Sequence, residues 1–411
     1  MSIIAAGIVS LLMTVSAGLP EVMWLGDPVG SSSAVSLGMG DCGFMEVSAL
    51  GILENPALLG IADHGLQVEF SAGMDFSVEK RTRLVYDQFE SSIGESEIAF
   101  NKGISFFPGG AAVAVRGIDG FPESLAFAAG WRVPSVYGYS YERTVRDAAY
   151  VKIGQEKLDI SGLNNEFDLA VSFIPSEVFS FGLAGGYVTG SRDVTWEVSH
   201  VDPTLDSTRA HRRESVSGIV TRGSILFVPD RRVFVSAALE YPMSLSVSPE
   251  TDGDAITWNV LSESDYDLDM PMTLRLGSIY IPGNRLRSRF IGNFYWSSDG
   301  SLEFESENLG LKNSWGVNAG VENTLPGGPV ARFGFGYDRS PVSSALDRMS
   351  FTAGMGFNIG EWNLDLGASF SPDRWKQTEI SGLPSFVSGD SLTVEETDTR
   401  VMFSISRVFD L

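Results

Sequence analysis

Apolar and polar residues alternate along most of this chain, from about residue 66 onward. Phe167, Leu169 and Val171, for example, alternate with Asp168 and Ala170. Successive side chains of a β-strand point to opposite sides, so each such segment has one apolar face and one polar or small-residue face. The pattern recurs at residues 125–133, 179–187, 351–359 and 362–370 and predicts an all-β protein.

Segment length and composition favour a transmembrane antiparallel β-barrel over a soluble β-sandwich. A barrel strand crosses a membrane with about 9 to 11 residues, whereas strands of soluble sheets have about five or six. The polar faces are rich in Gly, Ala and Ser and poor in long charged residues, which suits a crowded barrel interior. In the competing sandwich, the apolar faces would be buried against each other.

We expect the barrel to occupy residues 66–411. Strands are expected near residues 66–88, 96–107, 110–118, 124–133, 136–146, 164–174, 179–191, 214–228, 233–247, 270–281, 286–297, 312–324, 329–340, 348–358, 362–372 and 397–409. Tight turns with proline are expected at 107–109, 174–176, 228–230, 281–283 and 325–327, and long polar loops at 192–213, 248–269 and 373–396. Short turns on one rim and long loops on the other are typical of outer-membrane barrels, with both chain ends on the periplasmic rim.

Net charge and hydropathy exclude several classes of function. The chain has 29 Lys and Arg against 52 Asp and Glu, a formal net charge of −23. This charge repels phosphate backbones, so no nucleic-acid partner is expected. No internal apolar run reaches the roughly 18 residues of a membrane helix. The acidic residues have no EF-hand spacing, and neither a metal site nor a cofactor is expected.

Residues 1–17 are expected to be a signal peptide. Residues 3–15 are apolar, and the small side chains of Val15, Ser16 and Ala17 suit a signal peptidase, although no Lys or Arg precedes the apolar run. Export to the outer membrane of a diderm bacterium would follow.

The next segment, residues 18–65, is rich in small residues and does not alternate. Gly38, Gly40 and Gly43 formally match a dinucleotide fingerprint, but no hydrophobic strand precedes them and Pro56 interrupts the helix that should follow. A compact plug-like element is the better interpretation. Asn55 is expected to cap a short helical turn with its side-chain oxygen, Pro56 to occupy its first position, and Gly60 to end it in a left-handed conformation.

Catalysis is not expected, so the protein is predicted not to be an enzyme. The chain has three histidines, and His200 with Asp202 or His211 with Glu214 are the dyads that spacing allows. Both histidines fall in the expected loop 192–213, with no positioned nucleophile. The single cysteine, Cys42, excludes an intrachain disulfide and is expected to be a packing residue.

Aromatic residues lie near the ends of several expected strands, where girdles at the two lipid boundaries would place them. They include Tyr137, Tyr139, Tyr141, Tyr187, Tyr241, Trp296, Trp315, Tyr337 and Trp362.

Two short motifs resemble the opening of the long-chain fatty acid transporter superfamily of outer-membrane proteins. Residues 34–43 read A-V-S-L-G-M-G-D-C-G, and residues 54–60 read E-N-P-A-L-L-G. Members carry L-G-M-G-x-A-G followed by N-P-A-x-L, and Asp41 and Cys42 depart from that pattern. The superfamily includes toluene and xylene channels and related barrels of type IX secretion.

The resemblance implies a barrel of 14 strands, with 12 to 16 acceptable, and an N-terminal hatch inside the lumen at residues 18–65. The matching hatch residues are Gly38, Gly40, Gly43, Asn55, Pro56 and Ala57. The implied function is passive uptake of hydrophobic small molecules, fatty acid or hydrocarbon-like, gated by the hatch. The alternative is a docking or secretion component of the type IX kind with a secreted protein as partner; a hydrophilic porin is third, because inward-facing Arg and Lys are sparse.

The last strand carries an expected assembly signal. Phe403, Ile405 and Phe409 share one face, as in segments that the barrel-assembly machinery reads, while Arg407 on that face suits a position near the membrane interface. Besides this machinery, the expected partners are outer-membrane lipid, lipopolysaccharide and the hydrophobic small molecule.

Deletion of residues 397–411 is predicted to abolish insertion into the outer membrane, because the last strand would be missing from the ring. Heat-modifiable gel migration of membrane fractions measures insertion. Normal insertion of the truncated chain would contradict the topology.

Overall fold

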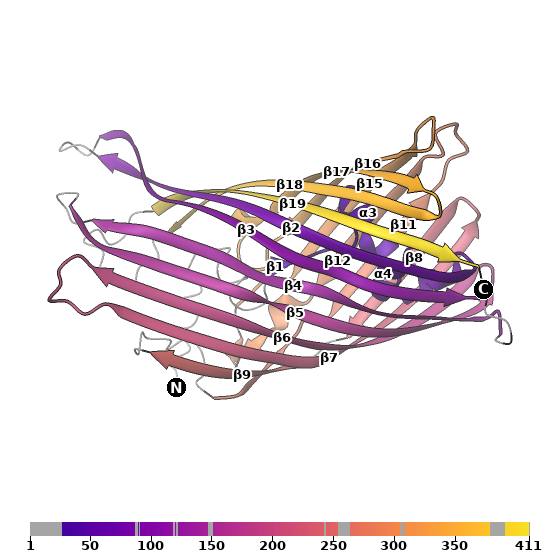
Figure 1. Ribbon diagram of the computed structural model, residues 1–411, viewed down its shortest axis with the longest axis horizontal. Helices are drawn as coiled ribbons and strands as arrows, with labels where there is room; N and C mark the ends of the chain where they lie inside the picture. The colour runs from indigo at the N-terminus through magenta and orange to yellow at the C-terminus, as the bar shows by residue number, and fades with distance from the viewer. Residues whose placement is uncertain are drawn as a thin grey trace.

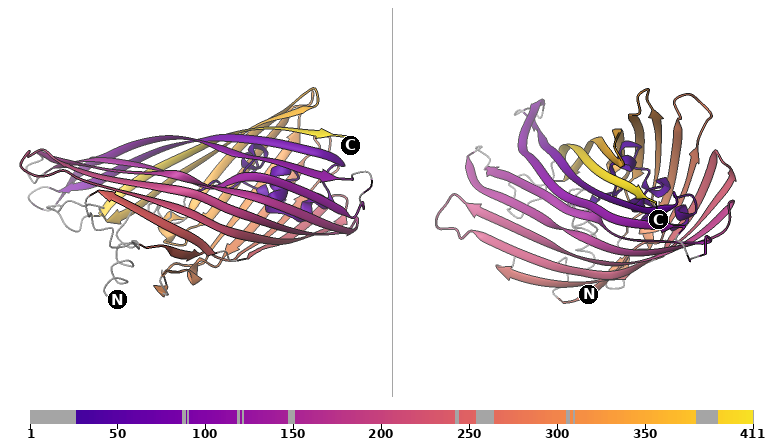
Figure 2. Two further views of the ribbon diagram at one scale, coloured as in Figure 1. Left: turned by 60° about the horizontal axis from the view of Figure 1, so that its bottom comes forward. Right: turned by 45° about the vertical axis from the view of Figure 1, so that its right-hand side comes forward.

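The computed structural model describes residues 27–86, 89, 91–117, 120, 122–146, 151–241, 244–253, 264–304, 307–308, 310–378 and 391–410. The expected signal peptide, residues 1–17, lies outside these residues. Their main feature is an antiparallel β-barrel with short helices inside it (Figures 1 and 2).

Fourteen strand positions form the wall in the described residues. Twelve are single strands: β2 (Gly65–Tyr86), β3 (Ser92–Arg116), β4 (Leu125–Arg146), β5 (Lys152–Ser176), β6 (Phe179–His200), β7 (Thr208–Asp230), β12 (Arg289–Ser297), β15 (Ser314–Thr324), β16 (Val330–Arg339), β17 (Arg348–Ile359), β18 (Trp362–Thr378) and β19 (Ser391–Phe409). Two are made of two segments each: β8 (Val233–Tyr241) with β9 (Ser244–Gly253), and β10 (Tyr266–Asp269) with β11 (Thr273–Tyr280).

Pairing between the first and last wall strands closes the ring. β8 and β9 both pair with β7, and β11 and β10 pair with them in turn, so each pair of segments occupies one position. β19 pairs with β18 on one side and with β2 on the other. The prediction of 14 antiparallel strands is confirmed.

The remaining elements are small. They are β1 (Asp27–Pro28), α3 (Ala34–Gly38), η1 (Gly43–Met45), α4 (Ala49–Glu54), η2 (Pro56–Gly60), η3 (Asp299–Ser301), β13 (Glu303–Phe304), β14 (Glu307–Asn308) and η4 (Ser344–Leu346). Among the described residues, no helix has both the length and the apolar character needed to cross a membrane.

An apolar band covers the outside of the barrel near the rim of short turns. On β5 the outward residues Phe167, Leu169, Val171 and Phe173 are exposed, and the inward residues between them are buried. The band continues around the ring through Phe181, Leu183, Ile219, Leu239, Leu276, Phe290, Phe333, Phe351, Met355, Leu366, Phe403 and Phe70. The predicted alternation of an apolar outer face and a small or polar inner face is therefore confirmed for this part of the wall.

The wall is much taller on one side than on the other. Strands β2 to β7 have 22 to 25 residues, whereas β11 to β17 have 8 to 12 where they build the wall (Figure 1). The predicted loop 192–213 was wrong, because β6 runs to His200 and β7 begins at Thr208. The predicted loop 373–396 was also partly strand, since β18 runs to Thr378 and β19 begins at Ser391.

A change of environment along the strands explains the missed segments. On β6, Val194 and Val198 are buried on the inner face, while Asp193 and Glu197 point outward. Beyond the membrane the outside of a barrel meets water, so polar residues face outward and apolar residues inward. The period of two persists, but its apolar face changes sides.

Two of the five expected proline turns, at residues 281–283 and 325–327, lie in the connections between neighbouring strands. Residues 174–176 and 228–230 instead form the last residues of β5 and β7, and the turns follow at 177–178 and 231–232. The turn expected at 107–109 was wrong. Pro108 lies within β3, opposite Ala72 of β2, next to a register shift between Ser71 and Ala72. A proline that lacks an N–H is tolerated in a strand at such an irregularity.

A bulge in β4 overturns the expected place of three tyrosines. The pairing of β4 with β5 shifts between Arg132 and Ser135, so odd-numbered residues that face outward before the bulge face inward after it. Phe127 is exposed, whereas Tyr137 and Tyr141 are buried. Tyr137, Tyr139 and Tyr141 therefore belong to the lumen and not to an aromatic girdle.

Replacing Leu169 by Arg is expected to destabilise the barrel by about 2–4 kcal/mol, because a charge would enter the middle of the apolar band. Ser161→Arg is the matched control, since Ser161 also faces outward on β5 but lies above the band. Denaturant titration in phospholipid vesicles measures both, and equal effects would place the membrane elsewhere.

Candidate functional site

Residues 27–64, here called the lumenal segment, lie inside the barrel (Figure 2). Its elements touch the wall on several sides: α3 contacts β16 to β19, α4 contacts β2 to β5, η1 contacts β11 and β12, and η2 contacts β4 to β7. The largest side chains of the segment are fully buried, among them Met39, Met45, Leu50, Ile52, Leu53, Leu58 and Leu59. The segment therefore fills the bore at this height.

The predicted glycines of the segment lie where backbone meets backbone. Gly40 has φ of +80°, and a Cβ there would lie 2.5 Å from the carbonyl oxygen of Ala319. Its N–H donates to Oγ1 of Thr352 at 2.8 Å. A Cβ on Gly38 would lie 3.0 Å from the Cα of Gly354. Only small residues fit this approach.

Matching glycines of the wall, which were not predicted from the sequence, face those of the segment. On β15 to β18 the inner face carries Gly320, Gly334, Gly354 and Gly367, and a Cβ on any of them would meet the backbone of residues 34–40. The recurrence of glycine on the polar faces of four successive strands was the available signal. The two sets of glycines let α3 and its C-terminal turn lie directly on the wall.

Asn55, Pro56 and Ala57 also attach the segment to the wall. The side-chain amide of Asn55 donates to the Phe44 carbonyl oxygen at 3.0 Å and to Oγ of Ser236 at 2.9 Å. The N–H of Ala57 donates to Oγ of Ser224 at 2.9 Å. Pro56 begins η2, as predicted.

Two details of the predicted cap were wrong. Asn55 precedes η2 but makes no side-chain capping bond, because its amide is engaged in tertiary contacts. Gly60 does not adopt a left-handed conformation and is followed by Ile61 as the C-cap residue. Cys42 is buried among apolar side chains, as predicted.

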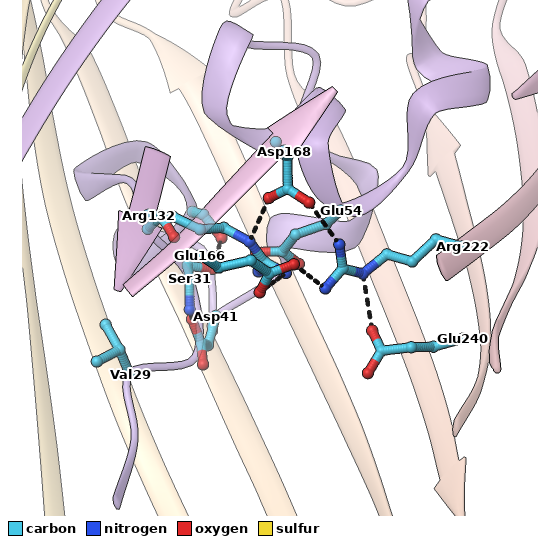
Figure 3. A network of polar contacts seen from close by, with 12 residues as sticks. Val29, Ser31, Asp41, Glu54, Arg132, Glu166, Asp168, Arg222 and Glu240 are labelled. Carbon is cyan, nitrogen blue, oxygen red and sulfur yellow. Dashed lines mark hydrogen bonds and ion pairs between the residues drawn. The ribbon is translucent and has the colours of Figure 1, made fainter. Parts of the chain in front are cut away.

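A network of charges lies between the segment and the tall side of the wall (Figure 3). Two arginines share several carboxylates within it, and the groups come from five elements: Arg132 of β4, Glu166 and Asp168 of β5, Arg222 of β7, Glu240 of β8 and Glu54 of α4. All except Glu240 are nearly fully buried.

The two arginines lie at the centre of this network and bind the same two carboxylates. Arg132 lies 2.9 Å from Glu166 and 3.3 Å from Asp168, and Arg222 lies 2.5 Å and 2.9 Å from the same two carboxylates. Glu54 is farther away, 3.8 Å from Arg132, and its burial raises the pKa of its carboxyl group. Buried charges of this kind persist when they are paired.

The wall has a seam between β3 and β4. These strands pair through Gly110–Arg116 and Ala126–Arg132, and above these residues the structure registers no pairing between them. Pro108 and Pro134 stand at the start of the seam and have no N–H to donate. Instead, β1 pairs with residues 135–136 of β4, and the N–H of Val29 donates to the Pro134 carbonyl oxygen at 3.0 Å.

Apolar side chains fill the seam and flank it on the outer face of the barrel. Val29, Phe107 and Val136 are buried in one cluster at the seam. Ile104 and Phe106 on the outer face of β3 are exposed, so the seam begins at the height of the outer apolar band. Arg400 of β19 pairs with Asp75 at 2.7 Å and donates to the Val29 carbonyl oxygen.

The inner face of the tall side carries two apolar clusters. One comprises Ala99, Tyr137, Tyr141, Leu158, Ile160 and Val194, with Tyr139 and Trp196 packed against it. The other comprises Val188, Val216, Val220, Leu245, Val247 and Leu268, with Tyr266 and Met270 packed against it. Ion pairs such as Arg81 with Glu79 and Arg143 with Glu156 lie on the same inner face.

The structure separates one of the two histidine dyads that spacing allowed. His211 faces outward, 3.3 Å from Asp193, whereas Glu214 faces inward and pairs with Arg192 and Arg212. Asp202 bonds to Thr204 in the turn between β6 and β7. Among the described residues, no group of three or more His, Cys, Asp or Glu side chains is arranged to hold a metal ion.

The expected assembly signal lies on β19. Phe403 is exposed on the outer face, and Phe409 lies two residues before the C-terminal Leu411. Arg407 packs over the rings of Phe409 and Trp362 and pairs with Glu361. The role of Phe403, Ile405 and Phe409 in assembly stays a prediction.

A closed fourteen-stranded barrel that encloses an N-terminal segment defines the class of fold. Solved structures with this fold include a FadL homologue from Pseudomonas aeruginosa, with 15% identity, a TM-score of 0.63 and coverage of 94% of this chain and 99% of that one. The toluene transporter TodX from P. putida has 14% identity, a TM-score of 0.60 and coverage of 93% and 100%. The toluene transporter TbuX from Ralstonia pickettii has 15% identity, a TM-score of 0.59 and coverage of 93% of this chain and 99% of that one.

These similarities confirm, at the level of fold, the resemblance carried by residues 34–43 and 54–60. No known sequence family matches the chain, and no curated protein matches it either.

Replacing Gly40 by Ala is expected to loosen the lumenal segment, by about 1–2 kcal/mol for the left-handed backbone alone and more for the approach to Ala319. Gly185→Ala is the matched control, because a Cβ there meets nothing within 4 Å. The rate of Cys42 alkylation in the folded protein measures the loosening. Equal rates in both variants would show that the close approach is unimportant.

Proposed function

We propose that this chain is an outer-membrane channel for passive uptake of hydrophobic small molecules, fatty acid or hydrocarbon-like. In this proposal residues 1–17 are the signal peptide, residues 18–65 form a hatch and residues 66–411 form the barrel. The protein resides in the outer membrane of a diderm bacterium, and its partners are outer-membrane lipid, lipopolysaccharide and the barrel-assembly machinery. Transport rather than catalysis is the activity.

The seam between β3 and β4 is the observation that carries the proposal. Backbone N–H and C=O groups without hydrogen-bond partners are strongly destabilising at membrane depth. They are tolerated where they line a cavity or are covered by protein. A channel for water-soluble solutes gains nothing from such an interruption. An apolar cargo, by contrast, can leave the bore sideways into hydrocarbon through it.

The other features of the lumen agree with this route. Cargo that enters from the tall side meets the apolar clusters around Leu158 and Val216, and the lumenal segment blocks the bore below them. Val29 and Phe107 close the seam, so their displacement is the gating step. The solved structures of similar fold include two named as toluene transporters, which supports an apolar cargo.

Uptake into vesicles tests the substrate class. The purified mature protein is reconstituted, and the flux of a fatty acid and of an aromatic hydrocarbon is compared with that of a sugar. Faster flux of the apolar solutes is expected. Faster sugar flux would instead indicate a porin, and no flux of either would favour the docking or secretion role.

A disulfide across the seam is expected to stop uptake of apolar solutes. A Cβ on Gly138 of β4 lies 3.8 Å from the Cβ of Ser105 of β3, close to the separation of about 3.8 Å in disulfides. The variant Ser105→Cys with Gly138→Cys, in a Cys42→Ser background, should take up apolar solutes when reduced and fall to the level of empty vesicles when oxidised.

Ser77→Cys with Gly103→Cys provides the matched control. The Cβ atoms of this pair lie 4.0 Å apart across β2 and β3, whose pairing is continuous at these residues. Oxidation of the control pair should leave uptake unchanged. Undiminished uptake with a fully oxidised 105–138 bond would exclude the seam as the exit.

A further inference from the structure

Two carboxylates, Glu46 and Glu69, meet between the lumenal segment and the wall. Glu46 follows η1, Glu69 lies on the inner face of β2, and each exposes 2% of its surface. Both share Ser33 and Ser48 as hydrogen-bonding neighbours, with the Ser33 hydroxyl donating to Glu46 at 2.8 Å. The two carboxyl groups therefore lie near each other, beside the same two serines.

The remaining contacts of the pair are few. The N–H of Leu50 donates to Glu69 at 3.0 Å, and Oε2 of Glu46 has no hydrogen-bond partner. In the described part of the chain, neither carboxylate has a Lys, Arg or His within ion-pair distance.

Charged groups on two other strands face the pair but do not neutralise it. Arg289 of β12 faces Glu46 from a distance and is already paired with Glu322 of β15 at 3.2 Å. Asp365 of β18 faces Glu69 and adds negative charge, although it is itself paired with Arg332 at 2.6 Å. The nearby cations thus already have partners.

The charge network of Figure 3 differs from this pair because its carboxylates are matched by cations. There, Glu166 and Asp168 lie between Arg132 and Arg222, so two carboxylates are matched by two guanidinium groups. Glu46 and Glu69 have no such groups between them. Two neighbouring buried carboxyl groups cannot both be ionised at low cost, and protonation of one of them removes the repulsion.

We infer that Glu46 and Glu69 form a proton-binding site that holds the lumenal segment against the wall, and that loss of the bound proton releases the segment. This inference deepens the proposed function, because it names what regulates the hatch. The proton acts as a ligand that binds the docked segment more tightly than the released one.

The direction of the pH dependence follows from the raised affinity of the docked segment for a proton. Burial, and then the charge of Glu69, raise the pKa of Glu46 from 4.5 to about 8 in the docked segment. Once released into water, the group returns toward 4.5. The contribution to docking is therefore fully present below about pH 4.5, falls progressively between about pH 4.5 and 8, and changes no further above that.

Cys42 is a built-in reporter of release, because it is the single cysteine and is buried inside the segment. The full-length mature protein is alkylated in vesicles with a neutral maleimide across the pH range. Dividing each rate by that of the denatured protein at the same pH removes the ionisation of the thiol. The corrected rate is expected to rise about tenfold per pH unit between about pH 5 and 8 and then to level off.

Two substitutions remove the proton-binding pair, and one serves as the control. Glu46→Gln removes the carboxyl group whose pKa is raised to about 8 and should flatten the profile. Glu69→Gln removes only the second charge and should end the rise at a lower pH, because burial still raises the pKa of Glu46. Glu54→Gln is the matched control in the same segment, since Glu54 faces Arg132 rather than a second carboxylate, and it should keep the slope. A flat profile in the unsubstituted protein, or a slope that survives Glu46→Gln, would overturn the inference.

Infrared spectroscopy of the unsubstituted protein tests the inference even when a variant fails to fold. The unsubstituted protein should show a protonated carboxyl band at about pH 7 that disappears above about pH 8, and absence of that band would also overturn the inference. Neither measurement uses transport. A pH-dependent release without uptake of apolar solutes would leave the proton site standing and reject the channel.

Discussion

The structure depends on one constraint, which is that backbone N–H and C=O groups inside a membrane must find partners within the protein. The ring meets this constraint by antiparallel pairing all the way around, completed where β19 meets β2. The place where pairing lapses, between β3 and β4, is covered by other means. Val29 donates to the backbone of Pro134, and the side chain of Asn101 accepts from the N–H of Glu142. The lumenal segment thereby becomes part of the wall.

Buried charge is the second theme of the lumen, and it has two forms. Where guanidinium groups lie between carboxylates, as with Arg132 and Arg222, the contacts fix the relative positions of strands. Where carboxylates meet without a cation, as with Glu46 and Glu69, the contact depends on a proton. The segment touches both forms, through Glu54 and through Glu46. Firm attachment at one side and conditional attachment at another agree with the proposal that the segment acts as a hatch.

Because the wall is taller on one side, its tall strands have different surroundings at different levels. Below, the outside is apolar and the inside small or polar, while on the tall strands the apolar residues turn inward around Leu158 and Val194. The same period-two sequence therefore places its apolar residues outside at one level and inside at another. The bulge at Arg132 to Ser135 changes the face of β4 where the seam begins, so one irregularity turns Tyr137 inward and interrupts the pairing with β3.

The sequence by itself determined the strand class, two of the five proline turns and the nature of the N-terminal segment. Period-two alternation reports which residues share a face, and motifs such as Asn55-Pro56-Ala57 are local. Tertiary structure decided that residues 107–109 are strand rather than turn, that Tyr137 faces inward, and that Glu46 meets Glu69. The physical reason is that alternation does not state whether water or lipid covers a face, and no local pattern records which distant side chains a closed ring brings together.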